Sequence, residues 1–423
     1  MKIDPQTGLV KVSGWPMGVD NRRADFDLPD DTLRDGVNVD VLTSGQLRRR
    51  RGVSRVVPDS NAHSIFANAQ RMVWATPTTL RMMDTTGGVK TLLTDTRLAN
   101  TLSWVDMDGV MYFSNEQING IVNASGAYEP WGIAVPTTAP TLVAPTGPYM
   151  FQVTCTFVTS TGEESGAPLG AQVSTTDPAQ IVLMNIPQSA DSRVVATRIY
   201  ATEIDGEAFF RVVDIPAGLT TYAIEGPFGG GMSLTTQFNG PPPPGQLLEV
   251  HKGVIYIASG NTVWYTMPFR PRMVNNQKAF FQYPERVTLI KGVSAVGARV
   301  RHLDGMFVSS NALVFLRSVG SEEVEQIPIA PIRAVEGAVC NLPQTTDIMI
   351  FTDRGFVRCR QGGEIEMLTE KQLAPDRYNK GTMGHVQFNG HQAIIAIFDT
   401  PTTAGYASPD YAAGDALRRS ELA

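Results

Sequence analysis

The feature that most constrains the fold is a short strand–bend–strand unit that recurs along the chain. It is clearest in residues 251–265, where two apolar runs, 254–258 and 263–265, flank the sequence Ser-Gly-Asn-Thr. Runs of β-branched and aromatic residues on either side of residues that tolerate positive φ predict a β-hairpin. A second bend at Lys252-Gly253 precedes the hairpin, so the unit is predicted to contain three strands joined by two bends.

The same unit appears six times. Its leading bends fall at Ala69, Gly109, Gly253, Gly305, Asp347 and Gly390. Neighbouring bends are 40 to 52 residues apart, except for one interval of 144 residues between Gly109 and Gly253. A period of about 40–50 residues is typical of β-propeller blades. Each blade is covered on both faces by its neighbours, which accounts for middle strands that are apolar on both sides. The sequence therefore predicts an all-β fold, a β-propeller of about six blades. A degenerate seventh blade, or a first blade closed by an N-terminal hairpin, stays open.

The long interval predicts an inserted domain at residues 136–240. Proline-rich sequence at 135–145 marks its start, and the glycines at 229–231 with the prolines at 241–244 mark its end. Apolar and polar residues alternate along 151–157, which predicts a strand with one buried face. About seven short strands in a stretch of about a hundred residues are typical of an immunoglobulin-like or fibronectin-type β-sandwich.

The predicted division of the chain has four parts. They are an N-terminal arm (1–36), the propeller (37–135 and 245–400), the inserted sandwich (136–240) and a C-terminal tail (401–423). The arm is predicted to be mostly extended, with one helical turn at 29–34. Residues 37–41 and 46–51 are predicted to pair as a hairpin, and 411–422 to form a short helix in the tail.

Charge balance and cysteine content argue against several classes of protein. The 35 Lys and Arg against 41 Asp and Glu give a net charge of −6, which argues against a dedicated nucleic-acid or membrane binder. Nucleic acid can still slide past such a surface. The three cysteines, Cys155, Cys340 and Cys359, lack Cys-x-x-Cys spacing, which argues against a disulfide framework or a zinc site and fits a reducing site of synthesis. No signal peptide is expected, and the longest apolar run, 393–398, is too short to span a bilayer.

A catalytic site is not indicated. The carboxylate pairs are sequence neighbours, and in extended chain such neighbours point in opposite directions, which suits solvation: Asp30/Asp31, Glu163/Glu164 and Glu322/Glu323. The nucleophile-elbow, Walker, dinucleotide-binding and His-Glu-x-x-His motifs are missing from the sequence. The histidines either precede apolar strands or flank a bend without a third ligand nearby: His63, His251, His302, His385 and His391. We therefore predict a protein that is not an enzyme and that has no metal and no cofactor.

The sharpest charge feature is the run Arg48-Arg49-Arg50-Arg51. One interpretation is a solvated strand that protects a sheet edge and is balanced by nearby aspartates. The other is a contact to phosphate or a docking surface for a partner. The predicted subunit or partner contacts are Arg22, Arg34, Arg48, Arg49, Arg50 and Arg51.

Residues 18–52 also carry a family resemblance. The matching segments are Gly18-Val19-Asp20-Asn21-Arg22, Leu28-Pro29, Leu33-Arg34-Asp35-Gly36-Val37-Asn38-Val39-Asp40 and Ser44-Gly45-Gln46-Leu47-Arg48-Arg49-Arg50. This block resembles the opening of the tail nozzle or hub proteins of short-tailed bacteriophages, also described as tail tubular or packaged-DNA stabilisation proteins. The resemblance extends less specifically to 159–165, to Arg198-Ile199-Tyr200 and to 248–265. No enzymatic residue is carried over, because the family has none.

The resemblance implies a structural virion protein, made in the bacterial host cytoplasm and assembled into the phage tail. Its partners would be further copies in a ring, usually sixfold, and the portal-side adaptor or other tail proteins. Double-stranded DNA would pass through the ring without specific binding, since a slightly acidic lining repels phosphates, and no membrane insertion is implied. The alternative is a propeller that binds or hydrolyses carbohydrate, with the sandwich as an accessory module. Receptor binding through the sandwich is compatible with the tail role.

Overall fold

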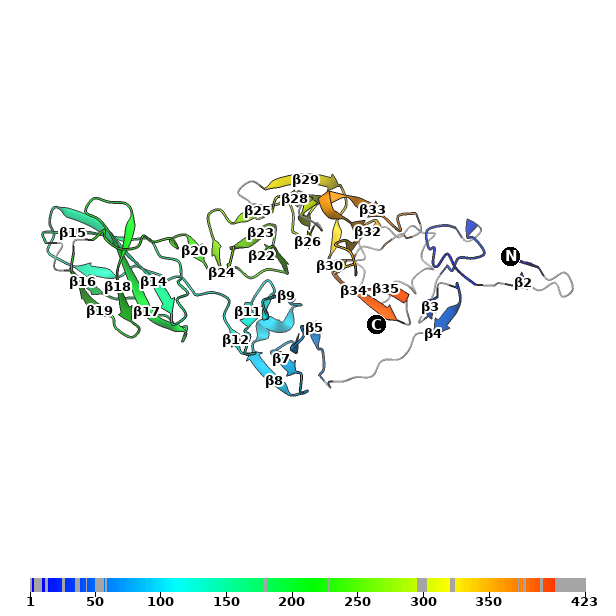
Figure 1. Ribbon diagram of the computed structural model, residues 1–423, viewed down its shortest axis with the longest axis horizontal. Coiled ribbons are helices and arrows are strands. Elements are labelled where there is room, and N and C mark those ends of the chain that lie inside the picture. Colours follow the sequence, from blue (N-terminus) through cyan, green and yellow to red (C-terminus); the bar gives the residue numbers. More distant parts are fainter. Residues whose placement is uncertain are drawn as a thin grey trace. The chain divides into compact units, whose positions relative to one another are not determined.

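The computed structural model describes an all-β chain (Figure 1). The described residues are 2–3, 10–11, 14–24, 27–34, 39–42, 44–49, 57, 59–177, 181–226, 228–294, 303–319, 324–371, 373, 375, 378–388 and 391–399. The chain divides into two compact units, one made of Met1–Asn61 with Tyr283–Ala423 and the other of Ala62–Gln282. Among the described residues, no helix is long and apolar enough to cross a membrane.

The unit Ala62–Gln282 contains three antiparallel meanders. The first has the strands β5 (His63–Ala67), β6 (Arg71–Ala75), β7 (Thr79–Asp84) and β8 (Val89–Thr94). The second has β9 (Ser103–Met107), β10 (Val110–Ser114), β11 (Asn119–Val122) and β12 (Tyr128–Glu129). The third has β21 (Leu247–His251), β22 (Val254–Ser259), β23 (Thr262–Met267) and β24 (Arg270–Asn275), with β20 (Asn239–Gly240) paired to β24 and β25 (Phe280–Gln282) paired to β23.

The other unit contains two further meanders and three hairpins. The meanders are β26 (Leu289–Val293), β27 (Gly305–Ser309), β28 (Leu313–Arg317) and β29 (Glu325–Ala330), and then β30 (Ala334–Asn341), β31 (Ile348–Thr352), β32 (Gly355–Cys359) and β33 (Ile365–Met367). The hairpins are β1 (Lys2–Ile3) with β2 (Val10–Lys11), β3 (Val39–Val41) with β4 (Leu47–Arg49), and β34 (Gly381–Phe388) with β35 (His391–Phe398).

Apolar packing joins successive sheets within each unit. In the second meander, Met111 and Phe113 of β10 pack in a cluster with the first meander, whereas Tyr112 between them packs in a cluster with the third. In the other unit, Ile350 of β31 faces a cluster shared with β26–β28, and Phe351 faces one shared with β34 and β35. Because strand neighbours point to opposite faces, these middle strands are apolar on both sides.

The predicted strands are confirmed at the hairpin of 251–265, where the register pairs Ser259 with Thr262. The three-strand unit is nevertheless incomplete, because each of the five meanders has a fourth strand. The predicted bend at Gly305 is also wrong, since this residue begins β27 and pairs with Val293. A Cβ there would meet the ring of Phe315, so glycine serves close packing here and not a turn.

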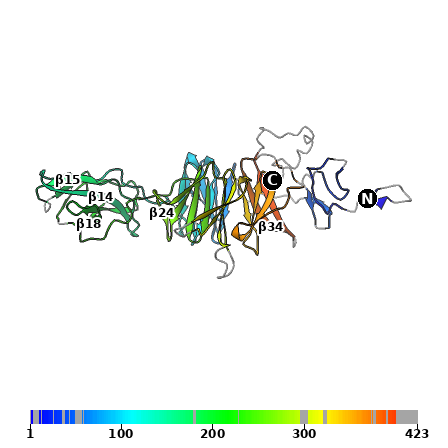
Figure 2. The ribbon, with the colours of Figure 1, turned by 90° about the horizontal axis from the view of Figure 1, so that it is seen from above.

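Seven strands between the second and third meanders form two sheets around one core. They are β13 (Thr141–Val143), β14 (Tyr149–Thr159), β15 (Ala171–Thr175), β16 (Ile181–Met184), β17 (Val194–Thr202), β18 (Phe209–Pro216) and β19 (Thr221–Ile224). The sheets have the orders β13-β16-β19 and β15-β14-β17-β18, and β14, β15 and β18 can be followed in Figure 2. Both contribute to one apolar core, with Val153 and Ile199 from one sheet and Leu183 and Ile224 from the other. We call this part the two-sheet region.

The N-terminal segment before β3 folds back on itself, where the sequence predicts an extended arm with a helical turn at 29–34. Val19 and Leu33 form a parallel bridge. The backbone N–H of Thr32 donates to the carbonyl oxygen of Pro29 at 3.0 Å and closes a single turn without a helix. The predicted tail helix at 411–422 lies outside the described residues.

Candidate functional site

The predicted arginine contacts have different surroundings. Arg22 is exposed and its guanidinium donates to the carbonyl oxygen of Glu370, while Arg34 donates to the carbonyl oxygen of Arg23. Both arginines therefore make a hydrogen bond within the chain, and their predicted contacts to a subunit or partner stay predictions. Arg48 is half-buried on β4 and Arg49 is exposed beside it. Arg50 and Arg51 lie outside the described residues, so their predicted contacts stay predictions.

The histidines and cysteines do not form a reactive cluster in the part of the chain that the structure describes. There, no group of three His, Cys, Asp or Glu side chains is placed to hold a metal ion. His63 lies on β5, where burial lowers its pKa, and its Nδ1 is 2.9 Å from the hydroxyl of Ser64. All three cysteines are buried free thiols, and burial raises the pKa of Cys155 and of Cys359 to about 12.

The most organised polar site lies around Glu163 and Glu164, in the turn that follows β14. The sequence predicts that these carboxylates point apart into solvent. They do point apart, but their side chains are only 18% and 16% exposed. Each is held by its own set of partners.

Glu164 binds the outer face of the sheet that contains β14. Its Oε1 accepts hydrogen bonds from the hydroxyls of Thr156, at 2.7 Å, and Tyr200, at 2.6 Å. Its Oε2 accepts from Arg198 at 2.9 Å, and Arg198 also holds both carboxylate oxygens of Asp214. We call Thr156, Glu164, Arg198, Tyr200 and Asp214 the outer cluster.

The outer cluster explains why one sequence prediction failed. Alternation along 151–157 predicts that Thr154 and Thr156 face solvent, yet both are completely buried. The chain after β14 folds back over them, and the hydroxyl of Thr154 donates to the carbonyl oxygen of Pro168 at 2.8 Å. The strand is therefore buried on both faces, one apolar and one hydrogen-bonded.

Glu163 turns the other way, toward the second and third meanders. It shares the guanidinium of Arg272 on β24 with Glu129 on β12, at Oε2–Nη1 distances of 3.4 and 2.9 Å respectively. Arg193, which precedes β17, lies 3.4 Å from the same Glu129 oxygen and holds Asp191 in a bidentate pair. We call Glu129, Glu163, Asp191, Arg193 and Arg272 the junction cluster, because it joins the two-sheet region to the meanders.

The pKa values of the three acids in the junction cluster are shifted in opposite directions. Burial raises the pKa of Glu163, and the positive charges of Arg272 and Arg193 offset this only in part. Burial acts on Glu129 as well, but hydrogen bonds from Asn123 and Arg272 hold its pKa below the ordinary value. The hydrogen bond from Arg193 lowers the pKa of Asp191.

Close backbone contacts and a small apolar cluster support the ionic contacts. A Cβ at Gly166 would overlap the carbonyl oxygen of Asn239 on β20. Gly132 has a φ of +87°, and a Cβ there would lie 2.7 Å from the carbonyl oxygen of Arg272. Ile133 packs with Phe157 and Val194 of the two-sheet region. The base of that region is thus fitted closely to β20 and β24.

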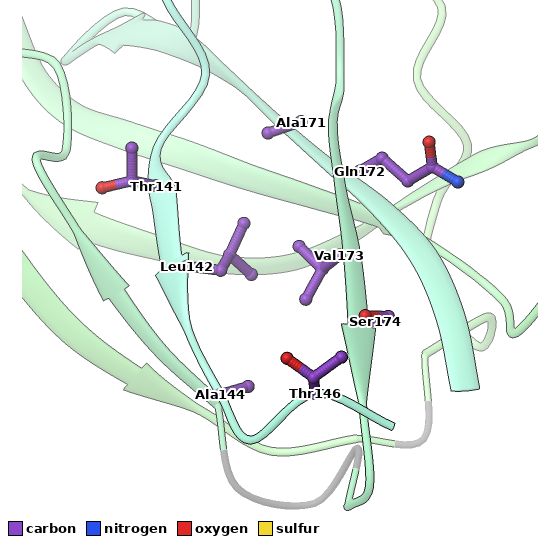
Figure 3. Close-up of a pocket in the computed structure, with 8 residues that line it drawn as sticks. All are labelled: Thr141, Leu142, Ala144, Thr146, Ala171, Gln172, Val173 and Ser174. Atoms are coloured by element: carbon purple, nitrogen blue, oxygen red, sulfur yellow. The ribbon is translucent and has the colours of Figure 1, made fainter. Parts of the chain in front are cut away.

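A separate hollow of about 350 Å³ opens at the side of the two-sheet region, between its edge strands β13 and β15 (Figure 3). Leu142 and Val173 point into it from the two sheets. The lining carries hydroxyl, amide and small apolar groups without a charge: Thr141, Leu142, Ala144, Thr146, Ala171, Gln172, Val173 and Ser174. These groups supply neither a nucleophile–base pair nor a metal-binding set.

Comparisons with known proteins leave the family open. No protein-family model matches the sequence, and no curated protein matches it. Among solved structures, the chain is similar to a catalytically inactive virginiamycin B lyase from Staphylococcus aureus, with 12% identity, 82% of this chain and 94% of that chain covered, and a TM-score of 0.31. It is also similar to apo AztD from Citrobacter koseri, with 8% identity, coverage of 73% and 72%, and a TM-score of 0.29. At these TM-scores neither likeness carries an argument about fold or function.

Proposed function

We propose that this chain is a structural subunit of a bacteriophage tail, a nozzle or hub protein that forms a ring around the DNA exit channel. In this proposal the meanders and the β34–β35 hairpin are blades of one propeller of about six blades. The two-sheet region is an immunoglobulin- or fibronectin-like sandwich inserted between two blades. The protein would act by assembly and not by catalysis, helping to retain and release the genome below the portal and its adaptor.

The observation that carries the proposal is a contact between two segments that share the family resemblance. Glu164 belongs to the segment 159–165, and Arg198 and Tyr200 belong to the other. These segments are 34 residues apart at Glu164 and Arg198, and they meet in the outer cluster. Two segments that share the resemblance therefore serve the same buried polar contact, as expected if the resemblance reflects a shared fold. This contact supports a resemblance that rests chiefly on the N-terminal block.

Surface charge is compatible with this role. The net charge of −6 favours sliding of a duplex past the ring over retention on it. The exposed Arg49 on β4 is available for a contact to a neighbouring subunit or to an adaptor. A heterologous contact of this kind closes into a ring when the rotation between copies is right.

Electron microscopy of the purified chain, alone and mixed with its portal-side partner, tests the proposal. We expect closed rings, with sixfold symmetry, in at least one of the two preparations. Particles that are monomeric in both would contradict it. Selective binding on a glycan array, or hydrolysis of host polysaccharide, would favour the carbohydrate alternative instead.

The arginine contact is tested separately by Arg49→Glu, with Arg97→Glu as the matched control. Arg97 is also an exposed arginine, and its partner is the neighbouring Asp95. We expect Arg49→Glu to lower the fraction of assembled protein and Arg97→Glu to leave it unchanged. Equal assembly of both variants would show that Arg49 is not part of the interface, and the proposed ring would be unaffected by that result.

A further inference from the structure

The junction cluster has an excess of negative charge that its own contacts do not neutralise. It holds three carboxylates against two guanidinium groups. In the described structure, the carboxylate of Glu163 accepts the fewest hydrogen bonds of the three, because its Oε1 is buried and accepts none. A buried carboxylate oxygen without a donor disfavours the ionised form.

The groups that face Glu163 come from four elements. Arg272 comes from β24, Glu129 from β12, and Asp191 with Arg193 from the turn before β17. Tyr112 on β10 also interacts electrostatically with Glu163, whose negative charge contributes to the raised pKa of the Tyr112 hydroxyl. Glu164, on the same turn as Glu163, is directed into the outer cluster and takes no part. The ionisation of Glu163 is therefore coupled to contacts with the meanders more than to contacts within its own turn.

We propose that the junction cluster is a proton-dependent latch between the two-sheet region and the meanders. Uptake of one proton by Glu163 tightens the latch, and protonation of Glu129 and Asp191 at lower pH releases it. The proton acts as a ligand here. It binds the closed and open states of the junction with different affinities and so shifts the equilibrium between them.

The direction for Glu163 follows from its raised pKa. When the junction opens, Glu163 becomes solvated and its pKa returns toward the ordinary value of 4.5. The closed state thus binds the proton more tightly, and its advantage is complete below pH 4.5 and is lost as pH rises through the raised pKa. Each unit by which the pKa is raised changes the ratio of closed to open junction about tenfold.

Glu129 and Asp191 act with the opposite sign. Their pKa values are lowered in the closed state, so the stability they contribute is present above their ordinary values of 4.5 and 3.8. That contribution is lost as pH falls through the lowered values. The two windows meet at the ordinary glutamate value of 4.5, and the latch is tightest near that pH.

Spin labels at Lys90→Cys on β8 and Glu207→Cys in the turn between β17 and β18 test the latch. Both positions are exposed, and the native cysteines are buried, so labelling is selective. Distance distributions are measured by pulsed electron paramagnetic resonance at about pH 7.5, about pH 4.5 and about pH 3. We expect the narrowest distribution at the middle pH and broader ones on either side.

Glu163→Gln is the deciding variant, and Glu225→Gln is its matched control because Glu225 is exposed in the same unit. At neutral pH, Glu163→Gln is expected to give a distance distribution as narrow as that of the unmutated protein near pH 4.5. Glu225→Gln is expected to follow the unmutated protein. A distance distribution that does not change with pH would overturn the proposal. So would a distribution for Glu163→Gln that changes with pH as in the unmutated protein, or one for Glu225→Gln that behaves like that of Glu163→Gln.

A measurement without the variant guards against a change in folding. The carboxyl carbon of Glu163 is followed by selective ¹³C labelling and NMR as pH is changed. The proposal requires this carboxyl to titrate above 4.5 in the folded chain and Glu129 to titrate below it. The reverse order would overturn the latch whatever the variant does.

Discussion

Strands β14 and β31 are both buried on two faces, but by different means. In β31, Ile350 faces one apolar cluster and Phe351 faces another. In β14, Val153 and Cys155 face an apolar core, whereas Thr154 and Thr156 on the opposite face are covered by a hydrogen-bonded turn. The same degree of burial is reached once with two apolar faces and once with one apolar and one polar face.

This difference determines which substitutions each strand tolerates. Apolar burial is non-directional and depends on volume, so a meander strand is sensitive to cavities. Polar burial is directional and depends on every group having a partner, so β14 is sensitive to the loss of a single acceptor. Four predictions test this contrast, three on stability in order of decreasing effect and a last one on thiol reactivity.

The largest effect is expected from Phe351→Ala in β31. Phe351 is 3% exposed and its ring centroid is 4.4 Å from that of Phe398 and 4.8 Å from that of Phe356. Removing the ring leaves a cavity that costs about 3–5 kcal/mol in the free energy of unfolding. Urea denaturation measures it, with Phe269→Ala as the control because Phe269 is 93% exposed. Similar losses for both variants would contradict the packing argument.

Glu164→Ala tests the polar face of β14. It leaves Arg198, Tyr200 and Thr156 without their shared acceptor, and we expect a loss of about 2–3 kcal/mol. Hydrogen exchange of residues 151–159, followed by mass spectrometry, localises the effect to this strand. Glu225→Ala, at an exposed carboxylate, is expected to stay within about 0.5 kcal/mol of the unmutated protein. If Glu164→Ala costs no more than this control, the outer cluster is dispensable for stability.

A reciprocal exchange of Val and Thr compares the two kinds of burial at nearly constant volume. Val357→Thr places a hydroxyl in the apolar cluster between meanders and is expected to cost about 1–3 kcal/mol. Thr156→Val removes the 2.7 Å hydrogen bond to Glu164 and is expected to cost about 1 kcal/mol. Both are measured by denaturant titration. If Thr156→Val stabilises the chain, the polar face is replaceable by an apolar one and the contrast fails.

The smallest difference is expected between the thiols of the two regions. Cys155 lies in the core of the two-sheet region and Cys359 in the core between meanders, and burial raises the pKa of each to about 12. Because the thiolate is the reactive form, both should react negligibly with Ellman's reagent at about pH 8 in the folded chain. Urea should expose three reactive thiols. A fast native reaction at only one of them would show that one core is less well closed.

Strand positions were predictable where apolar runs were long and bounded by turn residues, as at residues 254–258. The fourth strands were missed because several are short, such as β12 with two residues and β33 with three, and their pairing depends on a neighbour already in place. Gly305 was misread because glycine signals a bend and close packing equally well in sequence. The arginine run remained a prediction, since half of it lies outside the described residues.

The site shows the same limit. Glu163 and Glu164 were visible as a pair that would point in opposite directions, and that much holds. Their burial was not predictable, because Arg198 and Arg272 are remote in sequence and only the folded chain brings them near.

The sequence by itself therefore determined the all-β character, the hairpins and the recurrence of the meanders, because these depend on local propensity and on alternation within a strand. The tertiary structure alone decided which polar residues are buried and which acids have a raised or a lowered pKa. Burial and ionisation depend on the dielectric and on charges supplied by distant segments, and a turn of two glutamates acquires those surroundings only when β12, β17 and β24 are folded around it.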